Sequence, residues 1–321
     1  MSALKLAFQL LAPPGPRSRL TVMIFHRVLP THDPLRPSEP DANEFESRML
    51  DVRRWFNVLP LGDAIKRLKE GRLPARPLAI TFDDGYADNH AVALPILQRL
   101  GLPATFFVAT SFLDGGRMWN DTVIEAVRVY RAPELDLVDL GLDRYPVRTV
   151  EEKRAAIHQI LVGLKYIERD RRSAVADTIA QRAGTALPND LMMTSNQVAD
   201  LHHKGMTVGA HTATHPILLK LTSAAARDEI ASGKAALEQI VGAPVTLFAY
   251  PNGKPGQDYG PEHVSIVKEL GFEGAVSTSW GVSGSGSDTF QLPRFTPWDR
   301  VPTRYGARLM QNLLRTRYAL V

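Results

Sequence analysis

Six short apolar runs, each ended by polar or turn residues, limit the fold more than any other feature of the chain. They lie at residues 20–25, 78–82, 104–109, 206–210, 245–249 and 274–276. Runs of this length that are apolar at nearly every position are typical of strands with both faces buried, and such strands belong to parallel sheets. The sequence therefore predicts a parallel sheet that is covered on both faces.

Helical patterns separate these runs, and a glycine follows each of them. The patterns cover residues 89–100, 195–204, 223–241 and 261–270, and the glycines are Gly101, Gly205, Gly242 and Gly271. A glycine just beyond the last periodic residue commonly ends a helix. Strands that alternate with helices predict a parallel α/β architecture.

Residues 119–188 interrupt this alternation. The segment contains three helical patterns, at residues 120–130, 150–164 and 171–183, with polar stretches between them. We interpret it as a helical insertion within a single domain that spans residues 1–321, with core motifs at residues 77–296, rather than as a separate domain.

The composition excludes several classes of protein. The chain has no cysteine, so any metal must bind to histidine and carboxylate ligands. The net charge is only +4 and no dense Lys/Arg tract contains aromatic residues, so nothing supports nucleic-acid binding. No apolar stretch reaches the ~18 residues of a transmembrane helix. Residues 6–12 are apolar but short and interrupted by Gln9, which favours the cytoplasm over secretion, while a polysaccharide substrate would suit the cell envelope.

Polar residues follow several of the predicted strands directly. His26, Asp83, Asp84, His211 and Tyr250 all stand at such ends. In parallel α/β folds the active site lies at the carboxyl ends of the strands. A single polar residue at a strand end carries little information, but together these residues predict one shared site.

Two of these ends carry a pattern typical of a metal site. Asp83 and Asp84 are adjacent carboxylates, which are costly to bury together unless a cation compensates them, although a pair of turn-capping residues is the alternative. His211 and His215 are four residues apart, a spacing that can present two imidazoles to one ion or arise by chance. Combined, they provide two histidines and a carboxylate, a set that leaves positions open for water and substrate.

Three motifs in this order resemble the polysaccharide deacetylase family, also known as the NodB-homology family. They are Thr81-Phe82-Asp83-Asp84-Gly85, His211-Thr212-Ala213-Thr214-His215 and Phe248-Ala249-Tyr250-Pro251-Asn252-Gly253. Two further segments, Ile24-Phe25-His26-Arg27-Val28 and Leu292-Pro293-Arg294, resemble a branch of the family that acts on bacterial surface polysaccharides.

The resemblance implies a distorted (β/α) barrel with one divalent ion, commonly Zn²⁺, with Co²⁺, Ni²⁺ or Fe²⁺ as alternatives. It implies that Asp84, His211 and His215 are the metal ligands. Asp83 would be the general base that takes a proton from the attacking water, and the backbone N–H of Tyr250 would stabilise the oxyanion.

The chain departs from the family at the general acid. Familiar members have a histidine in a Leu-x-His motif near the carboxyl end, where this chain has Leu292-Pro293-Arg294. Arginine is too basic to deliver a proton near neutral pH, so we expect Arg294 to pair with Asp83 or another carboxylate. His26 is the candidate acid, with a structural, hydrogen-bonded histidine as the alternative.

The resemblance predicts a hydrolase that removes acetyl groups from N-acetylated sugars of a polysaccharide or lipid-linked glycan. Two alternatives stay open: cleavage of O-acetyl esters or small amides at the same site, and glycan binding without hydrolysis. Trp119, Trp280 and Trp298-Asp299 could contact sugar, although packing or capping explains them as well. The remaining histidines that we expect at the surface are His90, His202, His203 and His263.

Overall fold

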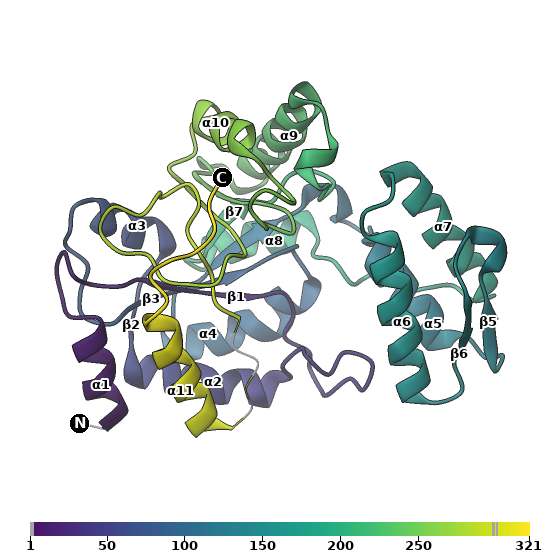
Figure 1. Cartoon of the computed structure of the whole chain (residues 1–321), viewed down its shortest axis with the longest axis horizontal. Helices are drawn as coiled ribbons and strands as arrows, with labels where there is room; N and C mark the ends of the chain where they lie inside the picture. The colour runs from purple at the N-terminus through teal and green to yellow at the C-terminus, as the bar shows by residue number, and fades with distance from the viewer. Residues whose placement is uncertain (1–2, 297–298, 300) are drawn as a thin grey trace. The chain divides into compact units, whose positions relative to one another are not determined.

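The computed structural model describes residues 3–296, 299 and 301–321. The chain divides into two compact units (Figure 1). Unit 1 comprises Met1–Thr31, Ser38–Leu113 and Met193–Val321, and unit 2 comprises His32–Pro37 and Asp114–Met192. Each unit is therefore assembled from stretches of chain that are separate in the sequence.

Unit 1 contains a parallel sheet whose strands match the predicted apolar runs. Within the described residues it has seven strands in the order β1-β3-β4-β7-β8-β9, with β2 paired to β3. The strands are β1 (Thr21–Phe25), β2 (Asn57–Val58), β3 (Pro77–Phe82), β4 (Thr105–Val108), β7 (Thr207–Ala210), β8 (Leu247–Ala249) and β9 (Gly274–Val276). Every residue of β1, β3, β4, β8 and β9 is buried, as strands covered on both faces require.

The segment of residues 292–295 joins the two edge strands. Leu292 bridges Val276 of β9, and Phe295 bridges Met23 of β1, both in parallel. The N–H of Phe295 donates to the carbonyl of Val22 at 2.8 Å. The curled sheet with this closing segment is a distorted (β/α) barrel, which confirms the predicted fold.

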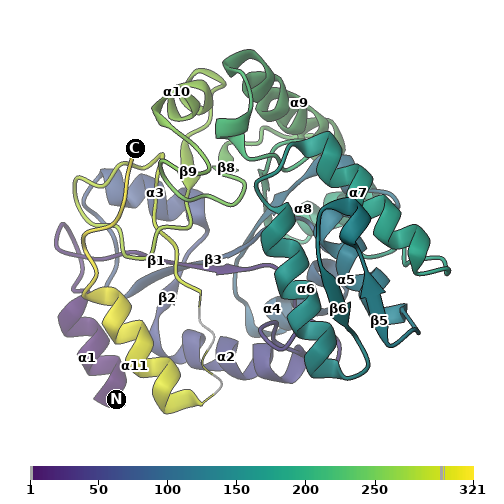
Figure 2. The ribbon, with the colours of Figure 1, turned by 45° about the vertical axis from the view of Figure 1, so that its right-hand side comes forward.

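Helices of unit 1 stand around the outside of the strands (Figure 2). They are α1 (Ala3–Leu11), α2 (Ala42–Trp55), α3 (Leu61–Lys69), α4 (Leu94–Leu100), α8 (Ser195–His203), α9 (Ser223–Val241), α10 (Pro261–Glu269) and α11 (Pro302–Leu313). Gly101 and Gly242 end α4 and α9 in the left-handed conformation, as the glycine pattern predicted. None of the described helices is long and apolar enough to cross a bilayer.

The helix predicted over residues 89–100 is divided in the structure. Its first part, Asn89–Ala93, is a π-helix in which the N–H of Leu94 donates to the carbonyl of Asn89. Pro95 follows immediately and has no N–H to continue an α-helical ladder, so a wider turn at this point is a physical consequence of the proline.

Unit 2 has its own elements and its own core. It contains α5 (Trp119–Val129), α6 (Val150–Leu164) and α7 (Arg169–Arg182), close to the three helical patterns of the sequence. It also contains an antiparallel pair, β5 (Glu134–Asp136) and β6 (Arg144–Pro146), which the sequence analysis did not predict. Both strands are three residues long and have only one buried position each, which is too short for a recognisable pattern.

An ion-pair cluster lies within unit 2. It consists of Asp33, Arg36, Asp121, Glu125 and Arg128. Arg36 donates to Asp121 at 2.7 Å and to Glu125 at 3.2 Å, while Arg128 donates to Glu125 at 2.7 Å and to Asp33 at 3.1 Å. The cluster connects the short stretch His32–Pro37 to α5.

Candidate active site

The Asp83-Asp84 turn follows β3 directly and is held tightly. The N–H of Asp83 donates to the carbonyl of Phe25 at 2.9 Å, which extends the ladder between β3 and β1. Asp84 has φ +77° and Gly85 has φ +93°. A Cβ at residue 85 would lie 2.9 Å from Val108, so the turn requires glycine there and the carboxylates are fixed against β4.

His211 and His215 lie on the loop that follows β7. His211 directly follows the last residue of this strand, and the N–H of His215 donates to the hydroxyl of Thr212 at 3.1 Å. This turn brings the two imidazole rings to a centroid separation of 4.7 Å. The four-residue spacing thus places both rings together through a loop rather than through a helix.

Asp84 and the two histidines converge. Nε2 of His211 lies 3.5 Å from Oδ1 of Asp84, and Nε2 of His215 lies 3.4 Å from the same oxygen. One ligand atom from each residue falls within 4.8 Å of the other two. Because Nδ1 of His211 is 2.7 Å from the carbonyl of Ala249, that nitrogen donates to it and Nε2 is the ring nitrogen that faces Asp84. This donor set suits a divalent ion.

The protonation of these residues leaves room for an exchangeable cation. Burial would raise the pKa of Asp84, but the bond from His211 and the charge of His215 hold this pKa well below its usual range. Burial lowers the pKa of His215 to about 4. Burial also acts to lower the pKa of His211, but the charges of Asp83 and Asp84 outweigh it and raise this pKa.

Arg294 forms a bidentate pair with Asp83. Nη1 of Arg294 lies 2.6 Å from Oδ1 of Asp83, and Nη2 lies 2.7 Å from Oδ2. Nε of Arg294 donates to the carbonyl of Ser277 at 2.8 Å. Burial would raise the pKa of Asp83, but the guanidinium outweighs it and lowers this pKa. Asp83 is thus ionised and oriented, with Oδ2 at 3.9 Å from Nε2 of His211. We refer to Asp83, Asp84, His211, His215 and Arg294 as the site cluster.

The backbone N–H and the hydroxyl of Tyr250 both donate to carbonyl groups. Its N–H donates to the carbonyl of Val276 at 3.2 Å as part of the sheet, so this donor is already used. Its hydroxyl is buried, donates to the carbonyl of Phe290 at 3.1 Å, and its ring stacks on Tyr259. Oxyanion binding by this N–H stays a prediction, and it would require the sheet bond to be shared or given up.

His26 lies at the exposed end of β1. Its carbonyl accepts a bond from the side-chain amide of Asn89 at 2.8 Å, which fixes the backbone. Its imidazole is near enough to contribute to the low pKa of both Asp83 and Asp84, after the larger effects of burial and of the groups already described. The structure therefore brings His26 close to the site cluster, and its role as an acid stays a prediction.

The other candidates have structural contacts. Cζ of Arg315 lies 3.6 Å from the ring centroid of Trp280, and Cζ of Arg172 lies 4.9 Å from the ring centroid of Trp119. Trp298 lies outside the described residues. The expectation for His263 was wrong: it is fully buried, because its Nδ1 accepts the N–H of Gly260 at the start of α10.

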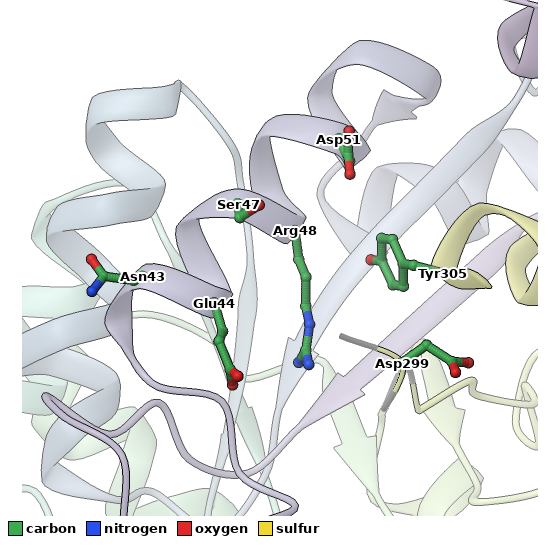
Figure 3. A pocket seen from close by; sticks show the side chains of 7 residues that line it. All are labelled: Asn43, Glu44, Ser47, Arg48, Asp51, Asp299 and Tyr305. Atoms are coloured by element: carbon green, nitrogen blue, oxygen red, sulfur yellow. The ribbon is translucent and has the colours of Figure 1, made fainter. Parts of the chain in front are cut away.

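A pocket of about 270 Å³ is lined by α2, Asp299 and Tyr305 (Figure 3). Arg48 extends from α2 between Glu44 and Tyr305. No member of the site cluster lines this pocket, so its charged walls belong to a different part of unit 1.

Comparisons with known proteins agree with the motifs. The family model described as polysaccharide deacetylase matches residues 70–135 and 164–275, more than half of the chain. YxkH of Bacillus subtilis (strain 168), which carries the provisional name of a polysaccharide deacetylase, is 19% identical over 283 residues, covering 86% of this chain and 71% of YxkH.

Solved structures show the same fold. IcaB from Ammonifex degensii aligns with a TM-score of 0.61 at 19% identity, covering 94% of this chain and 98% of IcaB. The deacetylase PplD from Streptococcus pyogenes, solved with acetate, aligns with a TM-score of 0.59 at 17% identity, covering 92% of this chain and 98% of PplD. At these identities the likeness supports the barrel and not a particular substrate.

Proposed function

Because the chain belongs to the polysaccharide deacetylase family, we propose that it hydrolyses acetyl groups on N-acetylated sugars of a polysaccharide or lipid-linked glycan. The observation that carries this proposal is the site cluster itself. Asp84, His211 and His215 form a donor set for one divalent ion, and an ionised carboxylate, Asp83, borders it.

The residues of the site cluster have different roles in amide hydrolysis. Asp84, His211 and His215 would hold a divalent ion, which would supply Lewis-acid chemistry for the acetyl carbonyl and the attacking water. Asp83 takes the proton of the attacking water while Arg294 keeps its carboxylate oriented. The syn sides of both oxygens face the guanidinium, so the proton goes to a remaining lone pair of Asp83.

The leaving amine also needs a proton when the C–N bond breaks. Arg294 cannot supply it, because a guanidinium stays protonated. We assign this step to His26, since it is exposed and lies near both carboxylates. Solvent then returns a proton to His26 and takes up the proton held by Asp83, so both residues regain their starting states.

The test is release of acetate from N-acetylhexosamine oligomers, measured with the appearance of free amine. We expect a chelator to abolish release and Zn²⁺ or Co²⁺ to restore it. Asp83→Asn should retain the metal and lose activity by about 10²–10⁴-fold, the usual contribution of a general base. Full activity in the chelated protein would refute the metal-dependent proposal.

The position of Arg294 favours a second candidate, an O-acetyl esterase. An alkoxide leaves more easily than an amine anion, so a site with a guanidinium in place of the usual acid is better suited to esters. Parallel assays on O-acetylated glycans and on their N-acetylated counterparts discriminate the two. Tight glycan binding with no acetate release from either, under metal-replete conditions, would instead support the catalytically silent alternative.

A further inference from the structure

The loop that carries both histidine ligands has an unfavourable backbone. Thr212 has φ +63° and His215 has φ +53°. A β-branched residue such as threonine rarely adopts this left-handed conformation, which costs free energy and persists only where neighbouring groups enforce it. Such a loop therefore needs external support to hold His211 and His215 around Asp84.

Glu229 of α9 provides much of that support. Its Oε2 accepts the N–H of Thr214 at 2.8 Å, and its Oε1 accepts the hydroxyl of Thr214 at 2.6 Å. Its backbone carbonyl accepts the N–H of Ala213 at 3.0 Å. One residue thus binds two of the three positions between the histidines.

Gly233, one turn later on α9, allows the helix to approach the same loop. A Cβ at residue 233 would lie 2.6 Å from the carbonyl carbon of Thr212 and 2.7 Å from its oxygen. Any larger residue would force the helix and the loop apart. Positions four apart share a helix face, so Glu229 and Gly233 present one surface to the loop.

The segment after β4 binds the loop as well. The N–H of Ser111 donates to the carbonyl of Ala213 at 2.9 Å, and the N–H of Thr110 donates to that of Thr212 at 3.4 Å. The main chain between the histidines is therefore bound both by the segment after β4 and by α9. Among these contacts, the charged group is the carboxylate of Glu229.

We propose that Glu229 is a positioning residue for the metal site, which holds the 211–215 loop in the conformation that directs His215 to Asp84. The proposal rests on the proposed metal dependence. The carboxylate of Glu229 binds the loop and is not one of the three ligand residues. Without it, the amide and hydroxyl of Thr214 lose the carboxylate that accepts from both, and the backbone at His215 can relax toward negative φ.

The experiment measures Zn²⁺ affinity by competition with a chromophoric chelator, with the metal-free melting temperature of each variant as a check on folding. We expect Glu229→Ala to weaken Zn²⁺ binding by about 10- to 100-fold, as loss of groups that orient metal ligands does. Glu229→Gln retains one acceptor oxygen and should lose less. The matched control is Asp228→Asn, the exposed neighbour on the same helix, which should bind as the wild type does.

A second variant distinguishes loss of the Glu229–Thr214 contact from damage to the fold of α9. Thr214→Val removes one donor to Glu229 without altering α9, and it should weaken Zn²⁺ binding in the same direction. If Glu229 acts through Thr214, the two losses will be less than additive in the double variant. Wild-type affinity in both Glu229→Ala and Thr214→Val overturns the positioning role alone. A wild-type protein that takes up no Zn²⁺ overturns the proposed metal dependence as well.

Discussion

The protein buries two groups of charged side chains, and they differ in what balances the charge. In the ion-pair cluster of unit 2, each carboxylate contacts a guanidinium. In the site cluster of unit 1, only Asp83 has such a partner, while Asp84 faces two imidazoles. A guanidinium has no lone pair and keeps its proton, whereas an imidazole can exchange a proton for a metal.

This difference indicates different roles for the two clusters. The carboxylates of the ion-pair cluster are neutralised by arginine side chains of the protein itself, so the cluster can stabilise the fold but has no cation to exchange. In the site cluster the carboxylate of Asp84 contacts imidazoles and, among the described residues, no guanidinium, so the proposed metal dependence rests on this carboxylate.

The largest effect should follow from removing that carboxylate. Asp84→Ala leaves two imidazoles without the anionic ligand, so we expect Zn²⁺ binding to fall below detection and acetate release to drop by ~10³-fold or more, since loss of Lewis-acid stabilisation costs several kcal/mol. Equilibrium dialysis and an acetate assay measure both. Asp88→Asn is a control carboxylate on the same segment, and it should still take up Zn²⁺. Retained Zn²⁺ binding in Asp84→Ala would show that this carboxylate is not needed to hold a cation, which contradicts the contrast drawn with the ion-pair cluster.

The next effect concerns the pair of Arg294 and Asp83 in the site cluster. Arg294→Met leaves the buried carboxylate of Asp83 without its partner, which should cost about 3–5 kcal/mol of unfolding free energy. Burial then raises the pKa of Asp83, so the acid limb of the pH–rate profile should move to higher pH. Zn²⁺ affinity should stay near that of the wild type. Arg294→Lys, which keeps the charge and loses the fork, should lie between the two.

A similar change in unit 2 should affect stability without affecting chemistry. Arg36→Met removes the guanidinium beside Asp121, whose side chain is fully buried, so we expect a loss of about 3 kcal/mol. Calorimetric unfolding measures this loss, and the Zn²⁺ affinity of the folded variant should not change. A matching loss of affinity would show that the two clusters are not independent.

The smallest effect should appear at low pH. Burial would raise the pKa of Asp33, but its bonds with Arg128 outweigh this and lower it. The pair therefore contributes stability above the unfolded pKa of Asp33, and this contribution is lost as the pH falls through the lowered folded value. For a partly exposed pair we expect about 1 kcal/mol or less. Denaturant unfolding from pH 7 to pH 3 should show a flatter profile for Asp33→Asn.

The sequence allowed the convergence of Asp84, His211 and His215 to be predicted because these residues stand at or near strand ends. A buried parallel strand is recognisable by its apolar run, and the residue after it must reach the same rim, as Asp84 and His211 do. The charge of Arg294 and its place in the Leu292-Pro293-Arg294 segment predicted a pair with Asp83 or another carboxylate, and the structure shows that the partner is Asp83.

Other features depend on proximity that only the fold creates. Glu229 has the appearance of any polar residue on an amphipathic helix, and nothing near it in the sequence indicates a contact with Thr214. The bond from the N–H of Tyr250 to the carbonyl of Val276 was not visible in the sequence, because it depends on β9 lying beside β8. The π-helix at Asn89–Ala93 could have been suspected from Pro95.

The segment that joins β9 to β1 has a consequence for synthesis of the protein. It closes the barrel through Leu292 and Phe295, and the residue between them that faces Asp83 is Arg294. On the ribosome, Asp84, His211 and His215 emerge long before this arginine, since chains are made from the amino terminus. The carboxylate of Asp83 therefore gains its guanidinium partner only when nearly the whole polypeptide has been translated.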